Sequence, residues 1–193
     1  MAIFSIAYLP SVHYLSAFVK AEKRVIDLGE YFEKQTLRTR TEILSANGRL
    51  QLSIPVAKAN KLKSTTAETK ISFAESWQRK HEQAFISAYK NSPYFEHYAD
   101  EFLLLLHAKE DSLANFQLNF LHWILKSFQY ENLQFEVSNS YVEGGEEVDF
   151  RKNIPAFVSK PYKQVFTYKF PFEPNLSCID LLFNKGPEAP IYL

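Results

Sequence analysis

The stretch IFSIAYLPSVHYLSAFVKAEKRVIDL, which covers residues 3–28, decides the fold class of this chain. Its apolar start at residues 3–8 predicts a short buried strand, and Pro10 ends that strand. Residues 11–21 carry apolar side chains at helical spacing, and residues 24–28 predict a second strand. A strand, a helix and a strand of these lengths form a right-handed crossover between parallel strands. The sequence therefore predicts an α/β fold whose first loop lies at the carboxyl edge of a sheet, where such folds bind ligands.

A β-hairpin is predicted near residues 37–56. Residues 37–44 have a β-rich composition with polar alternation, and residues 50–54 alternate apolar and polar side chains on the return strand. Between them, Asn47 and Gly48 form the strongest short-range turn signal for a hairpin.

Three helices are predicted in the middle of the chain. The first spans residues 73–91 and stops before Pro93. Ser92 and Pro93 then supply the cap and the first-turn proline of a second helix, which runs towards His107. Ser112 caps a third helix, whose apolar side chains again recur at helical spacing.

The last third of the chain predicts less regular structure. Residues 135–138 predict a strand, and residues 150–175, with four prolines, predict an irregular segment. Ser177 with Asp180 three residues later resembles a capping box, which starts a terminal helix, and Gly186 gives the stop signal.

Composition limits the class of protein. With 193 residues and 46% hydrophobic side chains, residues 1–193 are interpreted as a single domain. Lysine plus arginine equals aspartate plus glutamate, at 22 each, so the chain lacks the basic excess of a duplex-DNA binder and no nucleic-acid partner is expected. An aromatic share of 16% indicates either an aromatic-rich core or a cleft that stacks on flat ligands.

Three features predict a cytoplasmic location. Cys178 is the single cysteine, so no intramolecular disulfide forms, and its apolar neighbours favour a packed thiol over a nucleophile. The amino terminus lacks the basic region and the cleavage site of a signal peptide. No uncharged apolar run reaches the roughly 18 residues of a membrane span, so none is expected.

Short motifs spread over nearly the whole chain match a known pattern. They are Tyr8-Leu9-Pro10 with Tyr14; Tyr31, Lys34-Gln35 and Arg38-Thr39-Arg40; Asn47-Gly48 and Leu52-Ser53-Ile54-Pro55-Val56; Trp77, His81, Ala88-Tyr89 and Pro93-Tyr94-Phe95; and Asn175-Leu176-Ser177, Asp180-Leu181-Leu182-Phe183-Asn184 and Gly186-Pro187. Together these motifs resemble the WbqC-like protein family. Two positions depart from the family pattern: Ala7 lies near the place of a common Gln-Pro pair, and Thr39 replaces a common asparagine.

The resemblance implies a role in bacterial surface-polysaccharide biosynthesis, because the family is named from an O-antigen gene cluster. It also implies a transferase that moves a small acyl or aminoacyl group to an amino-sugar, although no established catalytic residue carries over. Two alternatives stay open: a non-catalytic binding or scaffold protein of a biosynthetic pathway, and a nucleotidylyl-type enzyme. The sequence leaves the cofactor, the oligomeric state and catalysis itself open.

The loop after the first strand is the leading candidate site. It places Tyr8, Ser11, His13 and Tyr14 at the predicted carboxyl edge of the sheet. His13 stands where nucleotidylyltransferases have the first histidine of a phosphate-binding pair, but the second histidine is missing. We interpret His13 as a candidate catalytic residue and the other three as candidate substrate-binding residues, with a merely lining role for His13 as the alternative.

Arg38 and Arg40 form a second candidate site. They lie two residues apart, so on a strand they share one face, and two guanidiniums on one face can clamp a phosphate or a carboxylate. The alternative is a solvated edge or pairing with Glu33 and Glu42.

Trp77, His81 and Tyr89 form the third candidate site, on the helix predicted for residues 73–91. Trp77 and His81 are four residues apart and share a helix face, so His81 is a candidate general base and the two aromatic residues are candidate substrate contacts. The alternative is a core stripe with a hydrogen-bonded histidine.

Two charged segments have an ordinary interpretation. The basic loop at residues 57–70 is expected to be the most mobile internal segment, with a functional lid as the alternative, and it contains Lys58, Lys61, Lys63 and Lys70. The acidic turn at residues 143–149 lacks the ligand spacing of a calcium loop, and the histidines lack zinc spacing, so no metal site is expected. A small-molecule or sugar-linked ligand remains as the expected partner.

Overall fold

The computed structural model describes residues 1–58, 63–144 and 149–193. Its elements, in chain order, are β1 (Ala2–Phe4), α1 (Val12–Lys20), β2 (Arg24–Asp27), β3 (Arg40–Ser45), β4 (Gly48–Ser53), α2 (Trp77–Tyr89), α3 (Phe95–Leu106), α4 (Leu113–Ser127), β5 (Glu136–Ser138), α5 (Cys178–Lys185) and the 3-10 helix η2 (Gly186–Tyr192). The predicted α/β class, the hairpin, the three middle helices and the terminal helix are all confirmed.

A parallel sheet with the strand order β1-β2-β5 forms one part of the fold, and α1 is the crossover between its first two strands. Ile3 lies opposite Val25. β1 ends at Phe4, well before the predicted end at Tyr8, because the chain turns away from the sheet after Ser5. The Tyr8 N–H then donates to the Leu37 carbonyl, 3.0 Å away, so the first loop leaves the sheet and meets the segment before the hairpin.

The antiparallel hairpin of β3 and β4 is separate from this sheet. β3 starts at Arg40, later than predicted, because the Thr36 carbonyl accepts from the N–H groups of both Thr39 and Arg40 and so closes a turn there. At the tip, Gly48 has φ of +101°, a conformation that a residue with a Cβ adopts only at a cost.

The predicted helix caps are right in part. Ser112 and Ser177 each accept a backbone N–H of the following helix through the hydroxyl oxygen. Ser92 is not a cap, because its hydroxyl donates to the Tyr89 carbonyl, and α3 begins three residues further on. The capping box at α5 is also incomplete, because the Asp180 carboxylate turns inward to other side chains.

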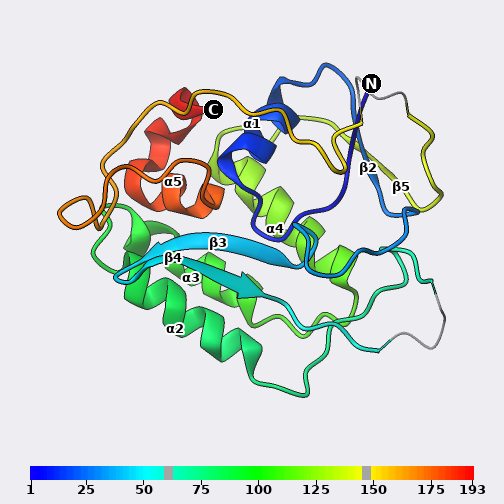
Figure 1. The fold of residues 1–193 in the computed structure, drawn as a ribbon, viewed down its shortest axis with the longest axis horizontal. Helices are drawn as coiled ribbons and strands as arrows, with labels where there is room; N and C mark the ends of the chain where they lie inside the picture. The colour runs from blue at the N-terminus through cyan, green and yellow to red at the C-terminus, as the bar shows by residue number, and fades with distance from the viewer. Residues whose placement is uncertain (59–62, 145–148) are drawn as a thin grey trace.

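The hairpin lies between two groups of helices. In Figure 1, α2 and α3 lie on one side of it, and α1 and α5 lie on the other. α4 contributes eight buried residues to a hydrophobic core that is rich in aromatic rings. The first loop, the turn before β3 and the residues before α5 meet beside this hairpin, through hydrogen bonds that are given below.

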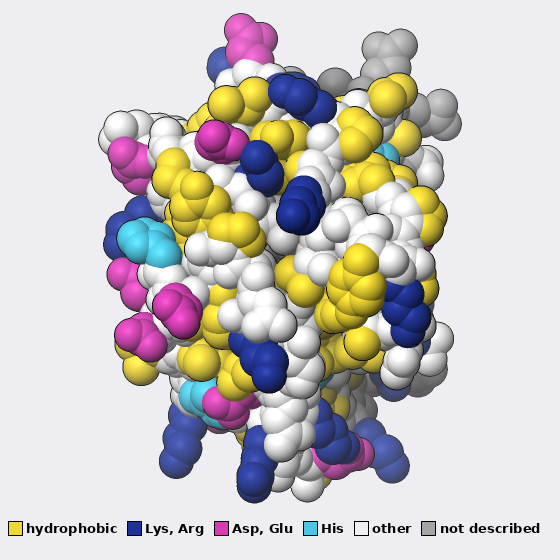
Figure 2. Space-filling view, turned by 90° about the vertical axis from the view of Figure 1, so that its left-hand side faces the viewer, with side chains coloured by type: hydrophobic (Ala, Val, Ile, Leu, Met, Phe, Trp, Pro, Cys, Tyr) yellow, Lys and Arg dark blue, Asp and Glu magenta, His cyan; other side chains and the backbone are white. Residues whose placement is uncertain are grey.

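Charges of both signs are interspersed on the face shown in Figure 2, in keeping with the neutral total. Within the described ranges, none of the helices has both the length and the apolar character that a membrane span needs.

Candidate functional site

A polar cavity of about 260 Å³ opens where segments distant in the sequence meet. It is lined by Ala7, Tyr8, Leu9, Pro10, Ser11 and Tyr14 of the first loop and α1; by Gln35, Thr36 and Leu37; by Arg40, Thr41, Glu42 and Gln51 of the hairpin; and by Ile154, Asn175 and Ser177. The predicted first loop therefore does line a cavity, but its partner is the hairpin and not the edge of the parallel sheet.

The cavity gathers residues with an unfavourable backbone conformation. Leu9, Gln35 and Asn175 have φ angles of 44°, 62° and 55°, in the left-handed region. Among the described residues the only other non-glycine residue of this kind is Gln129, which does not line the cavity. Each such residue costs roughly 1–2 kcal/mol, and such costs gather at functional sites because the surroundings must enforce them.

Hydrogen bonds from two hydroxyl groups hold Leu9 in this conformation. Its carbonyl accepts from Thr41 Oγ1 at 2.8 Å and from Ser177 Oγ at 2.9 Å. One residue later, the Pro10 carbonyl accepts the Cys178 N–H at 2.8 Å. The first loop is thus tied to both the hairpin and α5, which makes this wall of the cavity rigid.

Arg40 brings to the cavity a positive charge that forms no ion pair within the described part of the chain. The charged residues of the lining are Arg40 and Glu42. The Glu42 carboxylate accepts from Arg49 at 2.9 Å, and Arg49 also donates to Glu173 at 2.8 Å. Arg40 Nε is buried and has no hydrogen-bond partner within the described part of the chain. A buried donor without a partner is costly, so the cavity favours a ligand that supplies an acceptor or an anion.

Arg38 does not join Arg40 in this cavity. Its side chain is 2% exposed, Nε donates to Glu30 at 2.7 Å, and Nη2 donates to Ser5 Oγ at 2.8 Å. The two arginines lack the shared strand face that the sequence suggested, because Arg38 belongs to the turn before β3. Arg38 therefore fixes the fold, and Arg40 alone faces the cavity.

Ser11 and Tyr14 line the cavity and also fix the start of α1. Ser11 Oγ caps the helix by accepting the Tyr14 N–H at 3.3 Å. The Tyr14 hydroxyl donates to the Ser5 carbonyl at 2.6 Å, and burial raises the pKa of Tyr14 above its ordinary value. Tyr14 therefore stays protonated.

His13 lies outside the cavity lining. Its Nε2 is 3.2 Å from Ser159 Oγ, and its ring is 4.8 Å from that of Phe157. Burial lowers the pKa of His13 below its ordinary value of 6.5, against a hydrogen bond to the Phe157 backbone. The His13 side chain thus holds the irregular segment after β5 against α1.

Trp77, His81 and Tyr89 pack in the core as one face of α2. His81 Nδ1 lies 2.9 Å from the hydroxyl of Tyr8, and the His81 ring centroid is 5.1 Å from that of Trp77. Burial lowers the pKa of His81 to about 4, partly opposed by a hydrogen bond to the Ser53 backbone. The geometry matches the core stripe that the sequence left as the alternative.

Buried ion pairs fill the carboxyl edge of the parallel sheet. Asp27, at the end of β2, pairs with Arg151, which also pairs with Asp149. The hydrogen bonds of Asp149 raise the pKa of Arg151, against the effect of its burial. Among the described residues, these groups thus satisfy one another at the edge where α/β folds often bind ligands.

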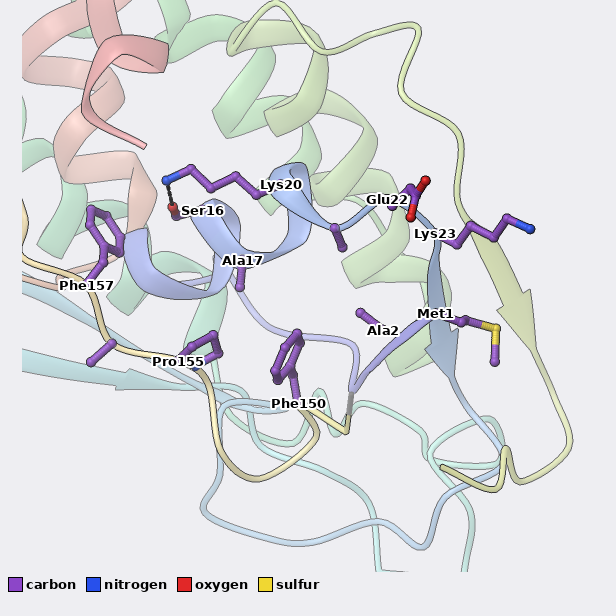
Figure 3. A pocket seen from close by; sticks show the side chains of 12 residues that line it. Met1, Ala2, Ser16, Ala17, Lys20, Glu22, Lys23, Phe150, Pro155 and Phe157 are labelled. Carbon is purple, nitrogen blue, oxygen red and sulfur yellow. Dashed lines mark hydrogen bonds between the residues drawn. The ribbon is translucent and has the colours of Figure 1, made fainter. Parts of the chain in front are cut away.

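A second, larger cavity of about 440 Å³ is mainly apolar (Figure 3). It lies between α1, the amino-terminal strand and the irregular segment after β5. Its walls include Ala17, Ala21, Phe150, Pro155 and Phe157. Ile154 lines the polar cavity and the next residue lines the apolar one, so the same segment separates the two.

The two charged segments are described only in part. Lys61, Glu146 and Glu147 lie outside the described residues, so the predicted mobility of the basic loop and the character of the acidic turn stay predictions. In the rest of the chain, no three histidine, cysteine or acidic side chains are placed to hold a metal ion together.

Several polar residues of the cavity were not singled out from the sequence. Gln35 and Asn175 belong to the motifs that carried the family resemblance, which is the signal that pointed to them. Gln51 has only the pattern of an ordinary polar position in a hairpin, and Glu42 was named only as a possible partner of the arginines. Only the tertiary structure brings these two residues to the cavity.

Comparison with known proteins gives one match. A family described as the WbqC-like protein family matches residues 7–154, which include the first loop, the hairpin and the three middle helices. No curated protein and no solved structure matches the chain.

Proposed function

This chain belongs to the WbqC-like protein family, and from that membership and the polar cavity we propose that it acts in bacterial surface-polysaccharide biosynthesis by binding a small, anionic, sugar-linked ligand. The family name is consistent with a biosynthetic role. Arg40 carries the proposal: its buried Nε has no partner among the described residues, and an anion would satisfy that donor and neutralise the charge.

The rest of the lining supports a hydroxylated ligand. The side-chain amides of Gln35, Gln51 and Asn175 offer both donors and acceptors, which suit sugar hydroxyl groups. Asn175 Oδ1 is already used by the His13 N–H, 3.0 Å away, so its amide nitrogen is the part left for a ligand. Tyr8, Ser11 and Tyr14 complete the wall that the sequence had proposed for substrate binding.

The transferase form of this proposal assigns proton removal to Glu42, the carboxylate that the described residues bring to the lining. The amine of an amino-sugar attacks the carbonyl carbon of an activated acyl or aminoacyl donor, and a C–N bond forms. The bond between that carbonyl carbon and the leaving group breaks, and the leaving group departs with the bonding electron pair. The proton of the amine passes to Glu42. Arg49 orients the carboxylate throughout.

A non-catalytic binding protein is the second candidate. It is favoured by the positions of His13 and His81, which bond to Ser159 and Tyr8 and do not line the cavity. The nucleotidylyl alternative relied on His13 as a phosphate contact, and its position beside Ser159 gives that alternative no support.

A thermal-shift screen followed by calorimetry tests the proposal, with nucleotides, nucleotide-linked sugars, sugar phosphates and acyl carriers as ligands. We expect a nucleotide-linked or phosphorylated sugar to raise the melting temperature of the wild type and of the control Arg79→Gln, which removes an exposed arginine of α2. Arg40→Gln should lower the affinity at least about 10-fold, the scale of a lost charged hydrogen bond.

Equal affinity in Arg40→Gln and the wild type would contradict the proposed site. If the wild type turns over an acyl donor and Glu42→Gln does not, the protein is a transferase. If the wild type binds its ligand tightly but turns over none of the donors, it is a binding protein.

A further inference from the structure

The apolar cavity is built from side chains too small to fill the space beside α1. Ser16, Ala17 and Ala21 follow one another along one side of the helix, where larger residues would have closed the gap. Phe150 and Phe157 stand opposite and are packed against the core. The result is a trough of about 440 Å³, a volume within the range of small-molecule sites.

The residues that line the trough come from α1, from the segment after it, from the amino terminus and from residues 150–157. Figure 3 shows Phe157 and Lys20 at one end and Met1 and Lys23 at the other, with Ala17 and Phe150 between them. A mainly apolar space of this size suits a flexible chain of methylene groups. Its burial there would release water from apolar surface on both sides.

Positive charge dominates the rim. Lys20, Lys23 and Glu22 are its charged side chains. Lys20 Nζ already donates to Ser16 Oγ at 3.0 Å and to the Leu193 carbonyl at 2.7 Å, and it lies 5.0 Å from the centre of the Phe157 ring. Lys23 forms no ion pair with any residue that the structure describes, so it is the cation left to meet a ligand.

We propose that this trough binds the aliphatic chain of an anionic amphiphile, with the chain along Ala17 and the head group at Lys23. A neutral chain would leave the lysine charge unused, and a cationic one would be repelled by it. This site is independent of the polar cavity and of the function proposed for it.

Titration calorimetry with monomeric amphiphiles tests the proposal on the whole chain. Octanoate, decanoate and dodecanoate vary the length, while decanol and decyltrimethylammonium vary the head group. Each added methylene should tighten binding by about threefold to fourfold until the trough is full. Decanoate should bind more tightly than decanol, and decyltrimethylammonium should bind least.

Two variants locate the ligand. Ala17→Leu fills the trough with another strong helix former and should weaken decanoate binding at least about 10-fold while the melting temperature is kept. Lys23→Gln should lower the affinity for decanoate several-fold and leave the affinity for decanol unchanged. Its control is Lys90→Gln, an exposed lysine after α2, which should change neither.

Other outcomes overturn the proposal. These are affinity that does not depend on chain length, equal binding in Ala17→Leu, and tighter binding of the cationic amphiphile. A wild-type dimer that Ala17→Leu converts to a monomer would show that a second copy of the chain covers the trough. If Arg40→Gln abolishes decanoate binding, decanoate binds in the polar cavity and not in the trough. If Arg40→Gln abolishes only the binding of the sugar-type ligand, the proposal for the trough is unaffected.

Discussion

At the scale of single residues, His81 makes the stability of the protein depend on pH. Burial lowers its pKa to about 4, below the ordinary value of 6.5 that it has in the unfolded chain. As the pH falls below 6.5, the unfolded chain takes up a proton that the folded chain does not. The stabilising contribution is therefore complete above pH 6.5 and is lost as the pH falls towards 4.

We expect this loss to approach about 3 kcal/mol, at about 1.4 kcal/mol for each pH unit between the two pKa values. His81→Gln removes the titrating group, so its free energy of unfolding should fall less steeply than that of the wild type between these pH values. Urea unfolding at a series of pH values measures the free energy of unfolding of the wild type and of the variant. Parallel curves for the two proteins would show that His81 is not buried in the neutral form.

The two arginines near β3 should respond differently to the same substitution. Arg38→Gln leaves Glu30 buried without its partner and should lower the free energy of unfolding by about 3–5 kcal/mol. Arg40→Gln breaks no ion pair in the described part of the chain and should change it by less than about 1 kcal/mol. Denaturant unfolding of the two variants measures this difference, and equal losses would contradict the division of roles.

Gln35 offers a test of whether the unfavourable backbone at the cavity serves binding. Its φ of 62° suits glycine, so Gln35→Gly should leave stability unchanged or raise it by up to about 1 kcal/mol. The same change removes an amide from the cavity and should weaken the sugar-type ligand of the polar cavity. Thermal unfolding measures the change in stability, and calorimetry on the same preparation measures the change in affinity. A variant that is less stable yet binds equally well would reverse the interpretation.

At the scale of elements, Asp180 fastens the irregular segment to α5. Its carboxylate accepts from Tyr162 at 2.7 Å and from Gln164 at 3.0 Å in that segment, and from Tyr89 at 3.0 Å on α2. Burial raises the pKa of Asp180, although these three hydrogen bonds oppose the rise. One side chain thus joins three parts of the fold.

Substitutions at Asp180 should separate the hydrogen bonds from the charge. Asp180→Ala leaves three buried donors without an acceptor and should cost about 3 kcal/mol or more. Asp180→Asn keeps an oxygen for Tyr162 and Gln164 and offers an N–H to the Tyr89 oxygen, so it should cost only about 1 kcal/mol. Unfolding in urea compares them. Equal costs for the two variants would mean that the negative charge itself is required.

The elements themselves were largely predictable from the sequence, and their ends were less so. Helices and the hairpin follow from the spacing of apolar residues and from Asn47-Gly48, which are local signals. The late start of β3 depends on the Thr36 carbonyl, and the missing cap at Ser92 depends on which acceptor its hydroxyl finds. Such choices between nearby partners are not encoded in periodicity.

At the scale of the whole molecule, Cys178 reports on cooperative opening. The thiol is fully buried at the start of α5, and burial raises its pKa. Only the exposed thiolate reacts with a thiol reagent. Labelling of Cys178 should therefore be slower than labelling of a free cysteine, by a factor equal to the population ratio of closed to open molecules. The rate should rise with urea in step with global unfolding, and a ligand of the polar cavity should slow it.

Mass spectrometry of timed labelling reactions measures these rates. Labelling of Cys178 as fast as that of a free thiol, in protein that is otherwise folded, would show that α5 detaches by itself. Asp180→Ala serves as a positive control, because it loosens the same helix.

The site was harder to predict than the fold, because it is assembled by tertiary contacts. Tyr8, Ser11, Tyr14 and Arg40 were singled out and do line the cavity, while their roles stay predictions. The sequence could not show that Arg38 would turn to Glu30, since the two side chains meet only when the segment after β2 and the turn before β3 pack together.

The wall of Ile154 and Pro155 has a consequence for the energetics of the molecule. Ile154 and Pro155 are consecutive residues, so a ligand in either cavity would contact the same stretch of backbone. Thermodynamic reciprocity then fixes the result: whatever factor an amphiphile imposes on the affinity for the sugar-type ligand, the sugar-type ligand imposes on the affinity for the amphiphile.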